Sequence, residues 1–509
     1  MLITWATYFY VWHVCICWVG SRPEYSLVTH PTPCVICYDM LMNMKALSQA
    51  IDFIDSWLAF RYERDEIPGY IVAIAHKGEV VFNKAYGYAN LEKNNRLNAE
   101  HIVRIASHSK TFTATSLMQL QEKGKLRIDD YAVNYLPWLK NHADKRWQKV
   151  TIRQLMSHGA GVIRDGLESD YWQLGRPFPN EKELKKEILE ADLVIDNNTK
   201  LKYSNFGYSL LGLIIEAVSG ETYNKYVIDH IVKPLGLKNT GPEYIEAIKD
   251  KIVTGYTRRD VNKKRLPIAQ IDTQAMSAAT GFYSTTEDLC NYFTAQMVGS
   301  KKLLDDESKK EMQRVQWHAN TPHQQNHEDY GLGIEIEFVN KHRTIGHGGG
   351  FPGHITKSMA DPKDELVVVV LTNCIDGPAS WMAKSIYNVI DYFQQNTPSS
   401  KPKHDLSHLQ GRYMNLWSMV NIVVTGDKVV ATYPDTWETL SKPEELIYVN
   451  NTTFKVEETD SFSSEGELVK FNVKNGKVES VDYNGSKMWP EEVWLKKIAG
   501  RKEFDNLQM

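Results

Sequence analysis

Hydrophobic residues recur at the period of an α-helix in four separate parts of the chain. The first part covers residues 44–64, where the apolar positions are Leu47, Ile51, Ile54, Leu58 and Tyr62. Pro68-Gly69 then breaks the pattern. Further helices are predicted over residues 110–123 and 206–219, each followed by a glycine that suits a helix C-terminus, and over about 379–393.

Strand patterns lie at both ends of this region. Residues 70–75 and 80–85, on either side of a Lys77-Gly78 turn, predict a hairpin. Residues 344–373 hold further strand-like runs, and the run LVVVVL at 366–371 is typical of a strand buried on both faces. We therefore expect the early and late strands to share one sheet with a helical insert between them, which is an α/β (α+β) architecture.

The composition and the hydrophobic pattern of the chain change after residue 395. Residues 396–403 are rich in Pro, Ser and Lys, and we place a linker over residues 396–404. Short alternating segments follow, separated by turns, and Asn475-Gly476 between two strand patterns is a strong hairpin signal. We expect residues 405–509 to form a small antiparallel β domain, most simply a closed β-barrel.

The first 43 residues differ from the rest. Residues 1–20 carry no charge, and the first charged residue is Arg22. Their length suits a membrane span or a signal segment, although no basic residue precedes the apolar run. Three interpretations stay open: an uncleaved anchor, an export signal, or upstream sequence outside the folded protein. Membrane contact is expected only if residues 1–20 are an anchor, so the compartment, cytoplasmic or exported, stays open as well.

The overall composition excludes several classes of protein. Of the 509 residues, 42% are hydrophobic and 24% are charged, which is ordinary for globular domains and excludes wholesale disorder. A formal net charge of -4 gives no reason to expect nucleic acid as a partner. Cys34-x-x-Cys37 could suggest metal or redox chemistry, but no second cysteine pair follows it, so neither role is expected.

The first candidate for chemistry is Ser107-His108-Ser109-Lys110, at or just before the start of a predicted helix. A separation of three residues puts Ser107 and Lys110 on one helix face, within hydrogen-bond reach. The helix N-terminus favours negative charge on the serine oxygen, and a neutral lysine beside a serine is one route to an activated nucleophile. Ser109 has no lysine three residues later. Taken alone, the motif is a weak signal, and a capping serine with a solvated lysine is the favoured interpretation.

Two further motifs indicate a catalytic site only when they are taken together with the first. Tyr203-Ser204-Asn205 offers a phenol as a proton acceptor and an amide to hold a substrate carbonyl, although a helix cap would look the same. Gly346-His347-Gly348-Gly349-Gly350 offers glycines at a strand, where a substrate can approach closely and an N–H can face an oxyanion, or else a tight turn. A lipase-type oxyanion loop is excluded, because the chain has no Gly-x-Ser-x-Gly elbow.

In this order, the three motifs resemble the penicillin-recognising serine hydrolases, a superfamily of class C β-lactamases, D,D-peptidases, D-aminopeptidases and family VIII esterases. The surrounding sequence is similar as well, in residues 104–106, 151–158, 208–216, 234–237 and 281–285. The likeness covers about residues 60–395, within a hydrolase domain that we place at residues 44–395. The C-terminal part resembles the lipocalin-like barrel domains that cover or narrow the active site in part of this superfamily.

The resemblance implies a role for each matching residue. Ser107 would be the nucleophile that forms an acyl-enzyme. Lys110 and Tyr203 would share the work of the general base, and Tyr203 would return the proton to the leaving group. Asn205 would orient both the substrate and Lys110. The N–H groups of Ser107 and Gly350 would form the oxyanion hole.

His347 and Gly349 would also bind substrate, but His347 departs from the family pattern. β-lactamases and D,D-peptidases usually carry a lysine there, which supplies a fixed positive charge for a substrate carboxylate. A histidine with an ordinary pKa near 6.5 is mostly neutral at pH 7. We therefore expect a serine hydrolase acting on a small amide, a peptide (with D-residues included), an ester or a β-lactam, with weakened recognition of a carboxylate.

The alternative is a non-catalytic binding or assembly protein on the penicillin-binding scaffold. Such a protein would be expected to lose Ser107, Lys110 or Tyr203, and all three are present. No metal or cofactor is expected for the hydrolase. Its partner would be a small-molecule or peptide substrate and no nucleic acid, and an oligomer is compatible with the sequence.

Other histidines receive simpler interpretations. His318, His323 and His327 cluster near Glu328 and could bind a metal, but no helical or strand periodicity fixes them, so a solvated loop is favoured. His158 is expected to brace a turn.

Overall fold

The computed structural model describes residues 42–319, 328–457 and 464–499. Residues 1–41, which hold the segment expected to be an anchor, an export signal or upstream sequence, and the Cys34-Cys37 pair, lie outside the described residues, as do His323 and His327. None of the helices in the described ranges is both long and apolar enough to cross a membrane.

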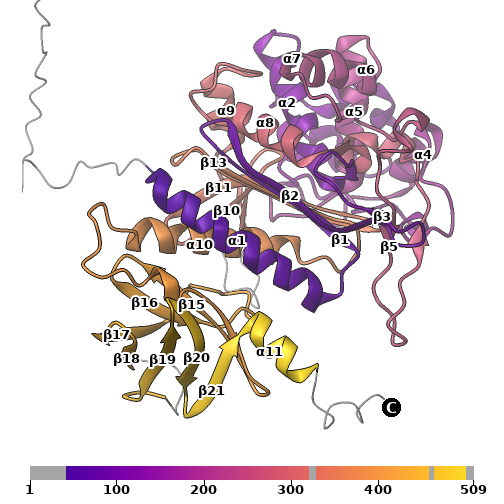
Figure 1. Ribbon diagram of the computed structural model, residues 1–509. Coiled ribbons are helices and arrows are strands. Elements are labelled where there is room, and N and C mark those ends of the chain that lie inside the picture. Colours follow the sequence, from indigo (N-terminus) through magenta and orange to yellow (C-terminus); the bar gives the residue numbers. More distant parts are fainter. Residues whose placement is uncertain (1–41, 320–327, 458–463, 500–509) are drawn as a thin grey trace, which may run out of the picture. The chain divides into compact units, whose positions relative to one another are not determined.

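One antiparallel sheet forms the centre of the part that precedes the predicted linker, with nine strands in the described chain (Figure 1). In spatial order they are β3 (Asn95–Arg96), β2 (Glu79–Asn90), β1 (Gly69–His76), β13 (Leu366–Thr372), β12 (His354–Asp361), β11 (His342–Phe351), β10 (Glu335–Val339), β9 (Glu328–Tyr330) and β8 (Trp317–Ala319). Strand β1 pairs with β2 and with β13, and Tyr70 lies opposite Thr372. The early and late strands therefore share one sheet, as predicted, and every residue of β13 is buried.

The two faces of the sheet have separate cores, which β1 shows directly. Its alternate residues Tyr70, Val72 and Ile74 pack in one apolar cluster, and Ile71 and Ala73 pack in the other. This alternation follows from the period of a strand, because successive side chains point to opposite faces. A strand with apolar residues on both faces needs a helical layer on each side.

Helices α1 (Met44–Asp65) and α10 (Ala379–Asn396) lie side by side on the first face (Figure 1). Asn43 caps α1 by accepting hydrogen bonds from backbone N–H groups of its first turn. The apolar stripe of α1, which includes Trp57 and Leu58, packs in the same cluster as Ile386 of α10 and the first face of β1. The periodicity of residues 44–64 thus predicted this helix and its buried face.

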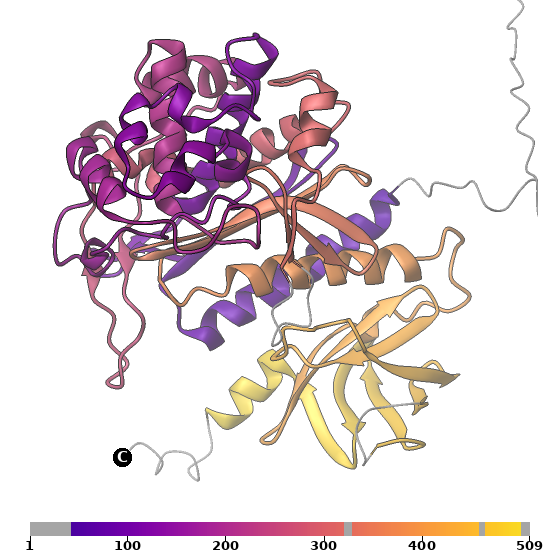
Figure 2. The ribbon, with the colours of Figure 1, turned by 180° about the vertical axis from the view of Figure 1, so that it is seen from behind.

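The helical insert covers the second face (Figure 2). Its central helix α2 (Ser109–Glu122) is buried from Ser109 to Leu120, and it contacts α5 (Asn205–Ser219). Gly220 ends α5 in a left-handed conformation with φ of 74°, as predicted. The other α-helices of this region are α3 (Ile152–Met156), α4 (Glu181–Glu190), α6 (Tyr223–Val227), α7 (Lys233–Leu235), α8 (Thr286–Gln296) and α9 (Asp306–Met312). Two short two-stranded sheets also lie in this part of the chain. In one, β4 (Val103–Arg104) pairs with β7 (Tyr283–Ser284), and in the other, β5 (Gly255–Tyr256) pairs with β6 (Pro267–Ile268).

The C-terminal strands form a closed antiparallel barrel, as predicted. They are β14 (Gly411–Met414), β15 (Met419–Thr425), β16 (Lys428–Thr432), β17 (Glu444–Asn450), β18 (Thr453–Val456), β19 (Leu468–Lys474), β20 (Lys477–Tyr483) and β21 (Ser486–Pro490), followed by α11 (Glu491–Ile498). Pairing of β14 with β21 closes the barrel. Asn475 and Gly476 both adopt positive φ, of 51° and 72°, which is the conformation that a tight hairpin turn requires.

Contacts of the barrel run to α1 and α10, on the sheet face opposite α2. The indole N–H of Trp57 donates to the backbone oxygen of Pro434 at 3.2 Å, and its ring meets Trp437 edge-on. Val423, Val430 and Leu440 of the barrel part belong to the apolar cluster of α1 and α10. The resemblance implied a barrel that could cover or narrow the active site, whereas these contacts place it on α1 and α10, the helical layer on the sheet face opposite α2.

Candidate active site

Ser107 lies in a single 3-10 turn, η1 (Ala106–His108), which leads directly into α2. Ala106 has a positive φ of 48°, a strained conformation for a residue with a Cβ, and such strain is often kept where a side chain must be aimed. The competing Ser109 is buried, and its hydroxyl donates to the Ala106 oxygen at 2.6 Å and accepts from the Phe282 N–H at 3.1 Å. Ser109 is therefore committed to holding this turn, and Ser107 is the available hydroxyl.

Two side chains donate hydrogen bonds to the hydroxyl oxygen of Ser107. The Lys110 ammonium nitrogen Nζ lies 3.0 Å from Ser107 Oγ, and the Tyr203 hydroxyl lies 2.8 Å from it. Lys110 also donates to Asn205 Oδ1 at 2.7 Å and to the Ala279 carbonyl oxygen at 2.9 Å. The structure thus brings together residues from α2, α5 and the segment just before each helix.

Burial sets the protonation of both partners of Ser107. Lys110 is fully buried, and this desolvation lowers the pKa of its ammonium to about 7, although the Asp165 carboxylate opposes the shift. Burial raises the pKa of the Tyr203 phenol well above its ordinary value, partly offset by the hydrogen bond to Ser107. At neutral pH the phenol is therefore a proton donor, and a substantial fraction of Lys110 is a neutral amine that can accept a proton.

Asn205 has a fixed orientation at the first turn of α5. Its Oδ1 accepts from Lys110, and its Nδ2 donates to Asp165 Oδ1 at 2.6 Å. Ser204 precedes it as the N-cap, accepting from the Gly207 N–H at 2.8 Å. Asp165 also accepts from the indole N–H of Trp172 at 2.9 Å. Asp165 therefore anchors the amide that holds Lys110.

His347 is buried on β11 and each of its ring nitrogens has a partner. Nδ1 lies 2.6 Å from the Gly348 carbonyl oxygen and 3.3 Å from Glu335 Oε1, so two acceptors face it. Nε2 lies 3.2 Å from the Tyr330 hydroxyl, which can donate to it. This arrangement fits a neutral ring with its proton on Nδ1. Burial also lowers the pKa of His347, which gives the neutral imidazole expected from the sequence a structural cause.

The glycines of β11 bring this strand against the turn that carries Ser107. A Cβ at Gly349 would collide with the carbonyl oxygen of Ile105, two residues before Ser107. At Gly350 the nearest atom to an added Cβ would be Ile355 Cδ1, at an ordinary 3.6 Å. Close approach therefore requires glycine at 349, whereas the assignment of the Gly350 N–H to an oxyanion hole stays a prediction.

Several residues of the site carried no signal in the sequence. Asp165 stands in an irregular loop, and Tyr330 and Glu335 lie on short strands with no motif around them. The carboxylate of Glu335 accepts from the Gly348 N–H at 2.8 Å and from Lys357 Nζ at 2.7 Å, so it fixes the strand beside His347. The successive pairing of β9, β10, β11 and β12 brings Tyr330 and Glu335 to His347.

Two further histidines of the sequence analysis, His158 and His318, have structural partners. The His158 ring packs at a tilt against Tyr203, with ring centres 4.2 Å apart, and its Nδ1 accepts from the Ser204 N–H at 3.1 Å. It therefore supports the turn before α5, as predicted. His318 is exposed and lies 2.8 Å from Asp329 Oδ1, whereas its two neighbours in the proposed metal cluster lie outside the described residues.

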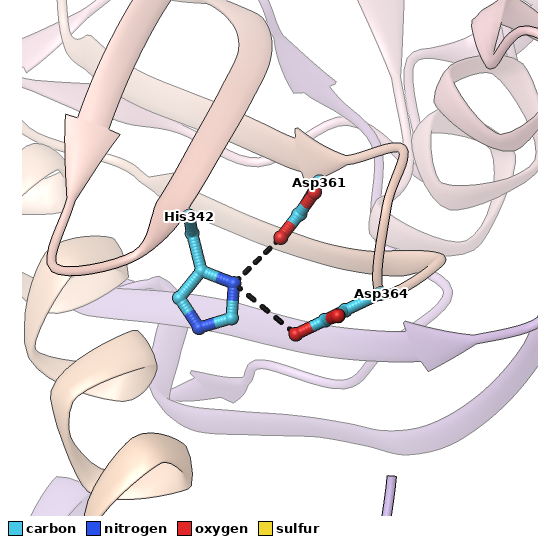
Figure 3. A group of neighbouring side chains, drawn as sticks. All are labelled: His342, Asp361 and Asp364. Atoms are coloured by element: carbon cyan, nitrogen blue, oxygen red, sulfur yellow. Dashed lines mark hydrogen bonds and ion pairs between the residues drawn. The ribbon is translucent and has the colours of Figure 1, made fainter. Parts of the chain in front are cut away.

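A second group with metal-ligand chemistry lies where β11 meets β12: His342, Asp361 and Asp364 (Figure 3). His342 Nδ1 is 2.6 Å from Asp361 Oδ2, and its Nε2 is 2.9 Å from Asp391 Oδ1 of α10. Burial lowers the pKa of His342, but the two carboxylates more than reverse this and raise it to about 9. The ring is thus a buried imidazolium that neutralises carboxylates, and it has no lone pair left for a metal.

Comparison with known proteins agrees with this geometry. A family model described as Beta-lactamase matches residues 54–386, which include all three motifs. The chain belongs to the beta-lactamase family. The resemblance to the penicillin-recognising serine hydrolases is thereby confirmed, and the chain is placed among hydrolases.

Relatives of the beta-lactamase family are distant from this chain in sequence. Protein flp of Staphylococcus aureus (strain MW2) is 22% identical over 375 residues, which cover 73% of this chain and 71% of flp. The octameric penicillin-binding protein homologue from Pyrococcus abyssi has a TM-score of 0.60 at 22% identity, covering 86% of this chain and 99% of its own. A D-stereospecific amidohydrolase from Streptomyces sp. has a TM-score of 0.56 at 22% identity, covering 67% and 97%. At these identities the two solved structures show the fold.

Proposed function

We propose that the protein is a serine hydrolase that works through an acyl-enzyme on a small amide, peptide, ester or β-lactam. The observation that carries the proposal is the double hydrogen bond to Ser107 Oγ, from Lys110 at 3.0 Å and from Tyr203 at 2.8 Å. A lysine with its pKa near neutrality and a protonated tyrosine supply a base and an acid to one hydroxyl. A purely structural serine would not need either group.

The first half of the reaction follows from these protonation states. Neutral Lys110 takes the hydroxyl proton as Ser107 Oγ attacks the substrate carbonyl, and the carbonyl electrons move onto oxygen. The N–H groups of Ser107 and Gly350 would stabilise that oxyanion. When the carbonyl re-forms, the bond to the leaving group breaks. Tyr203 gives its proton to the departing amine or alkoxide and regains one from the Lys110 ammonium.

Deacylation reverses the roles with water as the nucleophile. Neutral Lys110, directly or through Tyr203, takes a proton from water as it attacks the acyl carbonyl. The Ser107 oxygen leaves and is reprotonated, and the carboxylic acid departs. Because Tyr203 rests as a phenol, we assign the resting base to Lys110 and the proton relay to Tyr203, a sharper division than the sequence motifs implied.

The substrate class is supported only in outline. The solved structure of a D-stereospecific amidohydrolase has this fold, which supports an amide of a D-residue as one candidate. Esters and β-lactams react through the same acyl-enzyme. A neutral, fully partnered His347 offers a β-lactam carboxylate less than the usual lysine would, so we place β-lactams last.

Parallel assays would separate these classes. The full chain would be incubated with p-nitrophenyl butyrate, D-alanine p-nitroanilide and a chromogenic cephalosporin, with Ser107→Ala as the control. We expect ester or D-amide turnover that Ser107→Ala abolishes, with slow cephalosporin turnover. A fluorophosphonate probe should add one adduct, mapped by mass spectrometry to the peptide of Ser107. No turnover and no adduct in the folded wild type would favour the alternative, a non-catalytic binding protein.

A further inference from the structure

Arg164 lies beside Tyr203 of the proposed site, and its backbone is fixed by hydrogen bonds. Arg164 follows α3, and its carbonyl oxygen accepts from the N–H groups of Asn205 at 2.9 Å and Phe206 at 3.2 Å. These bonds tie the Arg164 backbone to the first turn of α5, beside Tyr203. Its neighbour Asp165 holds the Asn205 amide. The arginine is thus built into the same corner as the residues that contact Lys110 and Ser107.

The side chain of Arg164 is exposed to solvent. It is 65% exposed, its Nε lies 3.0 Å from Asp165 Oδ2, and its Cζ lies 5.6 Å from the centre of the Tyr203 ring. Among the described residues, its two terminal nitrogens have no hydrogen-bond partner. Its charge lowers the pKa of both Lys110 and Tyr203, which places it within electrostatic reach of the reacting groups.

Three other charged or ionisable groups of the site, Lys110, Lys357 and His347, are already engaged. Lys110 donates to three oxygens, and Lys357 is held by Glu335 and Glu337 on neighbouring β10. His347 is neutral with both nitrogens partnered, so it supplies no positive charge. Arg164 is therefore the cation of this group that keeps free donors, and they form a planar fork suited to a carboxylate.

We propose that Arg164 binds an anionic group of the substrate, so that the preferred substrates carry a carboxylate beside Tyr203, where the arginine fork recognises it, and not at the strand position of His347, where a β-lactam would place it. The inference rests on the proposed serine hydrolase. It adds the class of substrate, an anionic acyl donor. In this proposal Arg164, in the loop before α5, supplies the positive charge that a lysine at the position of His347 usually supplies.

Matched pairs of esters would test this on the full chain. One pair places the charge on the acyl side: p-nitrophenyl hydrogen adipate against p-nitrophenyl hexanoate. The second places it on the leaving group: the hexanoyl ester of meta-hydroxybenzoate against that of meta-hydroxybenzamide. The readout is the ratio of kcat/KM for the anionic to the neutral member, because a ratio cancels general effects of the mutation on Lys110.

We expect Arg164→Gln to lower this ratio by about tenfold in one of the pairs, mainly through KM, as for the loss of a hydrogen bond to a charged group. Arg164→Lys should lose less, because it keeps the charge without the fork. Arg127→Gln serves as the matched control, since this exposed arginine follows the far end of α2, a helix of 14 residues and so about 20 Å long. Its ratio should equal that of the wild type.

The experiment distinguishes a failure of the Arg164 proposal from a failure of the proposed hydrolase function. Ser107-dependent hydrolysis with an unchanged ratio in both pairs for Arg164→Gln would overturn the role of Arg164 alone. A ratio lowered equally in Arg127→Gln would also overturn it, because the effect would then be one of net charge. Hydrolysis that survives in Ser107→Ala, or no hydrolysis of any of the four esters together with no fluorophosphonate adduct at Ser107, would overturn the proposed function itself.

Discussion

Lys110 Nζ lies 3.0 Å from Ser107 Oγ across the junction between the turn η1 and helix α2. The lysine is fully buried and yet carries a potential positive charge, which is costly unless the charge is solvated by the protein or lost. Here it is solvated by three oxygens and its pKa still falls to about 7. Burial therefore gives Lys110 a pKa at which it can act as a base near neutral pH.

The rate should rise with pH as Lys110 loses its proton. Because its folded pKa is lowered to about 7, kcat/KM for a neutral ester should be small at pH 5 and increase through pH 7. Lys110→Arg, which stays protonated, should lose about a hundredfold or more. Steady-state kinetics between pH 5 and 9 would measure both. A flat profile over this range would remove Lys110 from the role of base.

Asp165 should tune that pH profile without touching Ser107. Its carboxylate opposes the lowering of the Lys110 pKa, so Asp165→Asn should move the rising limb of kcat/KM toward lower pH. Asp129→Asn is a suitable comparison, since Asp129 is a more exposed carboxylate paired with Arg153. The position of the limb should be unchanged in that variant. A shift toward higher pH in Asp165→Asn would contradict the electrostatic assignment.

Two adjacent glycines of β11 should respond differently to alanine. At Gly349 a Cβ meets the carbonyl oxygen of Ile105, so Gly349→Ala should lower the free energy of unfolding by roughly 1–3 kcal/mol and displace β11 from the turn of Ser107. Gly350→Ala has room for the methyl group and should cost less than about 1 kcal/mol. Denaturant unfolding would compare them. Equal losses in the two variants would mean that the contact with Ile105 does not decide the effect.

The buried His342 should make stability depend on alkaline pH. A folded pKa raised to about 9 means that its stabilising contribution is fully present below the ordinary pKa near 6.5 and is lost as pH rises through 9. His342→Gln, which leaves Asp361 and Asp391 without a buried cation, should cost about 3 kcal/mol. The variant should also lose most of this alkaline dependence in thermal unfolding.

The same cluster also makes a prediction about metals. Both ring nitrogens of His342 are occupied by carboxylates, so neither EDTA nor added Zn²⁺ should change the Tm at pH 7. A marked rise of Tm with Zn²⁺ that His342→Gln removes would show instead that the imidazolium gives way to a metal ion.

The local pattern of the sequence was enough to predict several elements of this fold. Alternation and helical period placed β1, β13, α1 and the barrel hairpin at Asn475-Gly476, because each depends on neighbours a few residues away. The spacing of Ser107 and Lys110 likewise fixes their contact, since three residues make nearly one helical turn. The order of the three motifs then pointed to the family.

Only the tertiary structure determines the protonation states of the site residues and the exposed position of the Arg164 charge. Nothing near His347 in the sequence indicates that Tyr330 and Glu335 will face its two nitrogens, and nothing near Arg164 indicates that Tyr203 will lie beside it. A pKa depends on burial and on charges brought from distant segments, and these come from strand pairing and helix packing. The sequence therefore named the groups that can react, and the fold determined which of them carry charge.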